Sequence, residues 1–316
     1  NEKFYMLGTI NNYFDGVLLG NNKTIKNVNV SGYSGGLVGY LNGGEIKEIN
    51  IENIKSTAKT NYSGLLIGMN NNGIINKINI TTGTVNANDY IGGLIGENAN
   101  GIIIGINMKD ITITGSNQVG GLIGQIKEQG TVIGVNLDNI EVKGSQYYTG
   151  GLIGYIPKKS IIKEVAIYGN VTGQYYTGGL VGQIGFDVVE VSGALVNANV
   201  TGIQNVGGIV GSKYGSNATL NAIMESGTIT GTSSQIGKVI GYLAYYSSLK
   251  DTSNKPFIES SITGDVNGTG YYFGYGNDGN IWVVPVGGTG GTTNPDEPTD
   301  TPTIEIDSNY TMTNIV

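Results

Sequence analysis

The sequence contains no cysteine, no histidine and no arginine, since all 17 of its basic residues are lysine. These absences exclude a Ser-His or Cys-His nucleophile pair, a thiolate or imidazole metal site and a zinc-binding helix built on two histidines. The lack of disulfides is compatible with a reducing compartment or with a fold that is stable without them. We therefore expect neither a metal site nor a cofactor.

Positive charge is also scarce, because the net charge is -7 and the isoelectric point lies near 4.7. Binding to nucleic acid depends on clustered basic residues that displace counterions, so nucleic acid is not an expected partner. No run of 18 apolar residues occurs, and we expect no membrane span. The N-terminal stretch NEKFYMLGTI has neither a basic signal region nor an initiator Met, which is compatible with a mature chain after removal of an export signal.

Glycine is abundant instead, with 54 of 316 residues, and much of it lies in a pentapeptide that returns every 28 to 30 residues. The pentapeptide reads GGLVG or GGLIG in five copies and is degenerate in three more, with first glycines at 35, 64, 92, 120, 150, 178, 207 and 237. A fixed period of this size predicts a stacked solenoid, whose coils bury their apolar faces against one another. Structural turn glycines, which leave no room for a Cβ or need a positive φ, are expected at Gly35, Gly39, Gly92, Gly96, Gly120, Gly124, Gly150, Gly154, Gly178 and Gly182.

Two further apolar patterns recur in each repeat. One is an apolar-Asn-apolar triplet such as 106–108, and the other is a β-branched pair before glycine such as 113–115. Their alternation predicts strands of three to five residues joined by tight turns. Together with the pentapeptide they predict an all-β, right-handed parallel β-helix (β-solenoid) with about three short strands per 28–30-residue coil.

Composition divides the chain into four parts. We expect an N-terminal cap over residues 1–26, the solenoid over 27–286, a Gly/Thr/Pro-rich linker over 287–303 and a C-terminal strand over 304–316. A lone strand needs a sheet to join. It is interpreted as an assembly strand that docks on a neighbouring subunit, as a cap on its own rod, or as the start of a further domain. Its alternating residues are Ile304, Ile306, Tyr310 and Met312.

A tyrosine ladder lies two positions before the first glycine of the pentapeptide. The next residue is small or β-branched, which predicts that it points inward and the tyrosine outward. An outward aromatic wall could bind a glycan or a protein partner. Stacking of like side chains for stability alone is the other interpretation, and the sequence favours it. The ladder consists of Tyr33, Tyr62, Tyr90, Tyr148 and Tyr176, and is interrupted by Gln118.

Asp110 and Asp138 occupy what the repeat alignment takes as the same phase of adjacent coils. Such a pair resembles the carboxylates with which polysaccharide-cleaving β-helices work. However, the chain offers no arginine to bind an acidic sugar, and no third carboxylate falls beside the pair. An enzyme is therefore the remote alternative.

The pentapeptides at this period resemble the GLUG repeats of large bacterial surface proteins, including adhesins and the non-catalytic regions of some immunoglobulin A peptidases. The resemblance covers residues 27–286. It implies a secreted or cell-surface β-solenoid that acts as a stalk or adhesive surface. Separately, the open solenoid ends and the C-terminal strand predict a homo-oligomer or fibre joined through them. A glycan- or host-protein-binding adhesin module is the alternative. Because the chain has no histidine for the peptidases' zinc motif, their activity is not implied.

Overall fold

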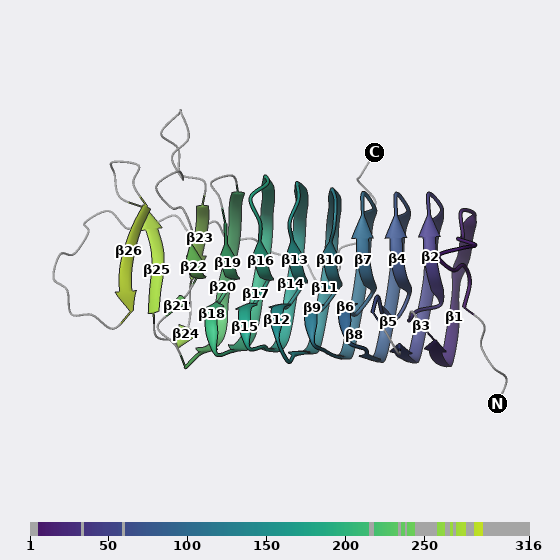
Figure 1. Ribbon diagram of the computed structural model, residues 1–316, viewed down its shortest axis with the longest axis horizontal. Coiled ribbons are helices and arrows are strands. Elements are labelled where there is room, and N and C mark those ends of the chain that lie inside the picture. The colour runs from purple at the N-terminus through teal and green to yellow at the C-terminus, as the bar shows by residue number, and fades with distance from the viewer. Residues whose placement is uncertain are drawn as a thin grey trace.

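The computed structural model describes residues 6–32, 35–58, 61–214, 218–232, 235–237, 239–243, 258–262, 266–267, 270–275 and 281–286. Every regular element in these residues is a β-strand. The strands stack into a solenoid with three faces, and equivalent residues of adjacent coils pair in parallel about 29 residues apart (Figure 1). The predicted all-β parallel β-solenoid is confirmed. No helix among the described residues is long and apolar enough to span a membrane.

Sheet 1 contains the long strand of each coil. Its strands pair in the order β1-β3-β5-β8-β11-β14-β17-β20-β23, and the short β24 also pairs with β20. The bounds are β1 Val17–Gly32, β3 Glu45–Ala58, β5 Ile74–Asn86, β8 Ile102–Gly115, β11 Gly130–Gly144, β14 Ser160–Thr172, β17 Val189–Thr201, β20 Ala218–Thr230, β23 Ile258–Ile262 and β24 Val266–Asn267.

Sheets 2 and 3 contain the short strands. Sheet 2 comprises β2 Val38–Asn42, β4 Ile67–Asn71, β7 Ile95–Ala99, β10 Ile123–Ile126, β13 Ile153–Ile156, β16 Val181–Ile184, β19 Val210–Lys213 and β22 Ile240–Leu243. Sheet 3 comprises β6 Asp89–Gly92, β9 Asn117–Gly120, β12 Tyr147–Gly150, β15 Tyr175–Gly178, β18 Gln204–Gly207, β21 Ile236–Gly237, β25 Gly270–Tyr275 and β26 Ile281–Val286.

The long strands correct the expectation that all three strands of a coil are short. The apolar-Asn-apolar triplet and the β-branched pair both lie on one strand, as β8 shows with residues 106–108 and 113–115. The predicted breaks between them are bends rather than ends. In β8 they fall at Gly105 (φ 67°) and Asp110 (φ 56°). Neither residue has a pairing partner on β11. Each inserted left-handed residue shifts the alternation by one, so the apolar side chains on both sides of a bend face the core.

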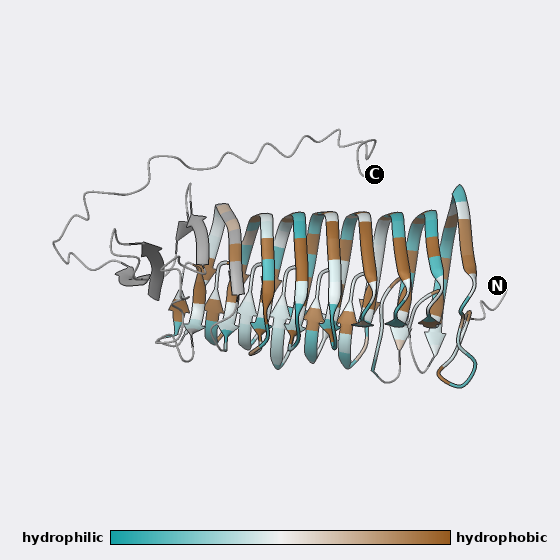
Figure 2. Ribbon diagram, turned by 90° about the horizontal axis from the view of Figure 1, so that it is seen from above, coloured by the Kyte–Doolittle hydropathy of each residue, from teal (hydrophilic) through white to brown (hydrophobic). Residues whose placement is uncertain are grey.

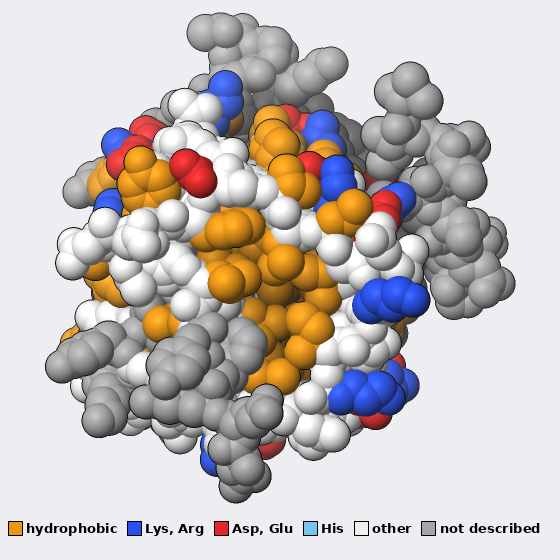
Figure 3. Space-filling view, turned by 90° about the vertical axis from the view of Figure 1, so that its right-hand side faces the viewer, with side chains coloured by type: hydrophobic (Ala, Val, Ile, Leu, Met, Phe, Trp, Pro, Cys, Tyr) orange, Lys and Arg blue, Asp and Glu red, His pale blue; other side chains and the backbone are white. Residues whose placement is uncertain are grey.

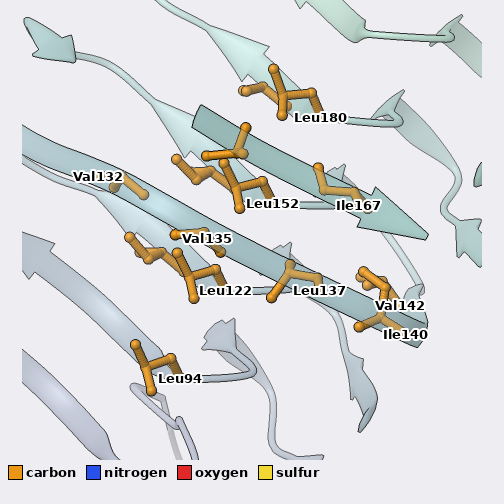
Figure 4. Close-up of a cluster of buried hydrophobic side chains, with 14 of the residues drawn as sticks. Leu94, Leu122, Val132, Val135, Leu137, Ile140, Val142, Leu152, Ile167 and Leu180 are labelled. Atoms are coloured by element: carbon orange, nitrogen blue, oxygen red, sulfur yellow. The ribbon is translucent and has the colours of Figure 1, made fainter. Parts of the chain in front are cut away.

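The pentapeptide is a corner, not a strand. In the copy at 120, β9 ends at Gly120 and β10 begins at Ile123, so the second glycine and the leucine connect sheet 3 to sheet 2. The third residue of each copy is buried, and it is leucine in six copies and Ile209 or Val239 in the other two. Backbone hydrogen bonds join it to the equivalent residue of the next coil from Leu66 to Val239. Figure 4 shows a row of these leucines, one from each coil, with Leu122 beside the inward side chains of β11: Leu94, Leu122, Leu152 and Leu180. In Figure 2 the apolar bands run in line from coil to coil along this core.

The corner glycines are required for space. A Cβ on Gly151 would overlap the carbonyl oxygen of Gly179, and a Cβ on Gly121 would overlap that of Gly151. First and fifth glycines are equally confined by backbone atoms, as Gly150 and Gly182 illustrate. None of the ten predicted turn glycines has a positive φ. Of the two reasons offered by the sequence, close approach of stacked backbones is the one that applies.

The two ends of the stack differ. At the N-terminal end, residues before β1 pair with sheet 2 through the bridges Leu7↔Val38 and Phe14↔Leu41. β1 begins at Val17, so the first coil starts within the segment expected to be a cap. At the C-terminal end, β26 is antiparallel to β25 and ends the parallel pairing of sheet 3. The predicted linker 287–303 and assembly strand 304–316 lie outside the described residues.

Replacing Gly151 by alanine should destabilise the fold by about 3 kcal/mol, because the added methyl group meets the backbone of the next coil. Gly193 provides the control, since its φ is 65° but the nearest atom to an added Cβ is 3.6 Å away. Asparagine tolerates this left-handed conformation, so Gly193→Asn should change stability by less than about 1 kcal/mol. Chemical denaturation of the three proteins measures both effects. Equal loss in the two variants would contradict the spatial explanation.

Candidate functional site

The ladder tyrosines share an unusual backbone conformation. Tyr62, Tyr90, Tyr148 and Tyr176 have φ values of 65°, 56°, 63° and 58°, and Gln118 and Asn205 at the same position have 47° and 57°. The left-handed region costs an L-residue about 1–2 kcal/mol, and bulky residues occupy it rarely. The ladder position is therefore a left-handed corner in six successive coils. Tyr33, the predicted first member, lies outside the described residues.

The left-handed corner turns two successive side chains outward. In the coil at 150, Tyr147 is 43% exposed, Tyr148 is half-buried and Thr149 is fully buried in the core. A regular strand would send Tyr147 inward. The sequence pattern identified the outward Tyr148, but it did not identify Tyr147 and Tyr175, because strict alternation assigns them to the core.

These side chains assemble into one aromatic surface over β12, β13 and β15, which we call the tyrosine cluster. Ring centroids lie 5.3 Å apart for Tyr148 and Tyr176, 5.1 Å for Tyr147 and Tyr175, and 4.9 Å for Tyr148 and Tyr155, and each pair is stacked within 24° of parallel. Tyr155 comes from the outward side of sheet 2 in the same coil. The cluster consists of Tyr147, Tyr148, Tyr155, Tyr175 and Tyr176.

The stacking decides what the cluster presents to a partner. Tyr148 stacks on two other rings, Tyr155 and Tyr176, so its aromatic faces are covered by protein. Ring edges and hydroxyl groups are what such a stack leaves for a partner. Burial raises the pKa of the Tyr148 hydroxyl, and Tyr155 adds to this effect, so the hydroxyl stays protonated at neutral pH. The surface offers hydrogen-bond donors on an apolar base, an arrangement that suits protein interfaces.

A smaller pair lies toward the N-terminal end. Tyr62 and Tyr90 stack at 4.8 Å, and near them the carboxylate of Glu97, only 4% exposed, is 3.3 Å from the amine of Lys127. Burial raises the pKa of Glu97, and burial followed by the Glu97 charge raises the pKa of Tyr62. Gln118 separates this pair from the tyrosine cluster in the ladder.

The predicted carboxylate pair is wrong. Asp138 pairs in register with Lys109, not with Asp110, and its carboxylate lies 2.8 Å from the Lys109 amine. Asp110 occupies the left-handed bend and accepts a hydrogen bond of 2.6 Å from Asn139, its equivalent in the next coil. The alignment was off by one residue, because the left-handed residue breaks the count. The described residues also contain no group of three or more His, Cys, Asp or Glu side chains suited to a metal ion.

A buried lysine was missed by the sequence analysis. Lys213 ends β19 and is fully buried, at the position where the two preceding coils have Ile156 and Ile184. Its amine donates hydrogen bonds to the carbonyl oxygens of Tyr214 (2.6 Å) and Gly185 (3.3 Å). Burial lowers the pKa of Lys213 to about 8. A lysine in a column of isoleucines is the sequence signal that could have found it.

No family model and no curated protein matches the chain. A solved structure similar to it is that of a candidate immunoglobulin A1 protease from Bacteroides ovatus, with a TM-score of 0.44 and 16% sequence identity over 84% of this chain and 76% of that one.

Thr149→Val should raise the free energy of unfolding by about 1 kcal/mol. The hydroxyl groups of Thr149 and Thr177 are buried without a hydrogen-bond partner, and Val119 occupies the equivalent position one coil earlier. Removing an unsatisfied buried hydroxyl removes its desolvation cost. Thr172→Val on the exposed side of β14 is the control and should be neutral. Thermal unfolding of both variants checks this, and a loss of stability in Thr149→Val would contradict it.

Lys213→Leu should change how stability depends on pH. The folded pKa of about 8 lies below the unfolded value near 10.4, so the unfolded state binds more protons between these values. The free energy of unfolding of the native protein therefore rises with pH between these two pKa values. The cost of burying the charged Lys213 amine is fully present below pH 8. The stability of the variant relative to the native protein should fall by about 2 kcal/mol between about pH 7.5 and pH 10. Denaturation at both pH values measures it, and a constant difference would contradict it.

Proposed function

We propose that this protein is an extracellular structural and adhesive β-solenoid that binds a protein partner through the tyrosine cluster. The observation that carries the proposal is the placement of tyrosine at left-handed ladder positions. Asn205 has the same left-handed conformation at the equivalent position, so the fold does not require tyrosine there. Strained positions of this kind point toward a functional surface.

The energies make stacking for stability alone an incomplete explanation. A left-handed tyrosine costs about 1–2 kcal/mol, and an aromatic pair contributes about 0.5–1.5 kcal/mol beyond its area burial. The two nearly cancel at Tyr148 and Tyr176. Asparagine or glycine would occupy the corner at a lower cost. The tyrosine side chains are therefore expected to serve a contact outside the coil.

The scaffold suits such a contact. The cluster lies on β-strands paired on both sides, and the rings hold one another in place, so little conformational entropy remains to be lost on binding. Covered ring faces favour a protein over a sugar, whose ring stacks on an open aromatic face. A glycan is the competing ligand class.

The extracellular location rests on the resemblance of the pentapeptides to GLUG repeats. A non-catalytic role fits the separate partners of Asp110 and Asp138, which leave the carbohydrate-cleaving arrangement without its pair of carboxylates. Fibre formation through the C-terminal strand is a second structural role, and it depends on residues 304–316.

The double variant Tyr148→Asn/Tyr176→Asn tests the proposal. Purified protein is applied to a panel of immobilised extracellular matrix proteins and to a glycan array. We expect the native chain to bind a protein of the panel and the double variant to bind it at least tenfold more weakly. Its unfolding free energy should stay within about 1 kcal/mol of the native value, because lost stacking offsets relieved strain.

Tyr62→Asn/Tyr90→Asn is the matched control, since it makes the same change on the same ladder outside the cluster. It should keep native binding. Unchanged binding in the cluster variant, together with a stability loss above about 3 kcal/mol, would assign the tyrosines to the scaffold alone. Binding only to glycans would move the proposal to the competing ligand class.

A further inference from the structure

The N-terminal end of the solenoid exposes the end of the apolar core. Figure 3 views the molecule from this side and shows hydrophobic side chains gathered across its centre. Three inward side chains of β1 are only half-buried, although the residues that they pair with on β3 are completely buried. These pairs are Leu18↔Ile46, Ile25↔Ile51 and Val28↔Ile54.

The same end also has a long strand edge. β1 has 16 residues and pairs only with β3 among the described elements. An apolar surface beside a strand edge is what a further coil, or the end of a second copy, would need in order to stack. The first coil therefore has both features of an association surface.

One residue opposes this association. Lys23 pairs in register with Ile49, and the column that continues from Ile49 is apolar and buried. Lys23 thus occupies the inward position of the first coil, and it is exposed because β1 has a pairing partner on one side only among the described strands. A coil stacked on this end would bury its ammonium group among isoleucines. The column runs through Lys23, Ile49, Ile78, Ile106, Val135, Val165, Ala194 and Ala222.

The other lysine of β1 has a different place. Lys26 pairs in register with Glu52 on the outward side of sheet 1, and the two side chains form an ion pair. Stacking of another coil would leave this ion pair at the surface. The two lysines therefore differ in direction on one strand: Lys23 lies in line with the apolar core, and Lys26 lies on the outward side.

We propose that Lys23 prevents a second copy of this chain from stacking on the N-terminal end of the solenoid. An inward-pointing charge on an edge strand prevents edge-to-edge association, because a buried ammonium group without a countercharge is strongly unfavourable. The proposal is independent of partner binding by the tyrosine cluster.

The test compares Lys23→Ile with Lys26→Ile by size-exclusion chromatography with light scattering over a range of concentrations. Lys23→Ile completes the apolar column, so its average mass should rise with concentration to at least twice that of the native protein. Lys26→Ile removes the same charge from the outward side and should match the native protein. Lys23→Met, with a side chain of similar length, serves as the second variant in case isoleucine impairs folding, which circular dichroism would reveal.

A site-specific measurement distinguishes this end from other surfaces. Because the chain has no cysteine, Ile25→Cys on β1 introduces a single thiol on the same inward side of the strand as Lys23. With Lys23→Ile, maleimide labelling of this thiol should slow as concentration rises. With Lys23 retained, the labelling rate should not depend on concentration.

Three results would overturn the proposal. The first is a constant mass for folded Lys23→Ile and Lys23→Met. The second is equal association of Lys26→Ile, which would indicate a general effect of charge. The third is concentration-dependent protection of the thiol with Lys23 retained, which would show that the native end is already occupied.

Discussion

The contact between the backbone of one corner and the backbone of the next is the constraint on which this structure depends. At Gly151 the carbonyl oxygen of Gly179 fills the space that a Cβ would need, and the same contact recurs from coil to coil. Strand pairing fixes the coil spacing near 4.8 Å, so stacked glycines such as Gly121 and Gly151 leave no space for a side chain between them. The repeated glycines follow from this spacing, and the apolar leucine beside them supplies the core.

Superposition of coils also places equivalent positions in columns. Residues of the same type in a column contact one another from coil to coil. A left-handed corner in one coil becomes a left-handed ladder, and tyrosines on it become a stack. Amides behave similarly, since Asn79 donates to Asn50 and Asn107 donates to Asn79 in adjacent coils. A side chain in a solenoid is therefore best understood through its neighbours one coil away.

The sequence predicted the solenoid because the period is a global property that survives local errors. It did not predict the long strands or the register of Asp110 and Asp138, since both depend on single left-handed residues such as Gly105 and Asp110 that no alternation rule counts. The outward Tyr148 was accessible to pattern analysis, because a buried residue always follows it. Tyr147, Tyr155 and Lys213 required the three-dimensional register, which places residues of different sheets and coils together.

The register of the coils also explains how two of the few lysines of this chain affect stability and association. Lys213 and Lys23 both stand in columns whose other members are mainly apolar, yet their surroundings differ. Lys213 is covered by adjacent coils, and burial lowers its pKa to about 8, so it weakens the stack at neutral pH. Lys23 lies on the last described strand of sheet 1 and is exposed, so it costs the native fold little. Its cost would arise only on stacking, and an end-coil charge can therefore limit length without weakening the coil that carries it.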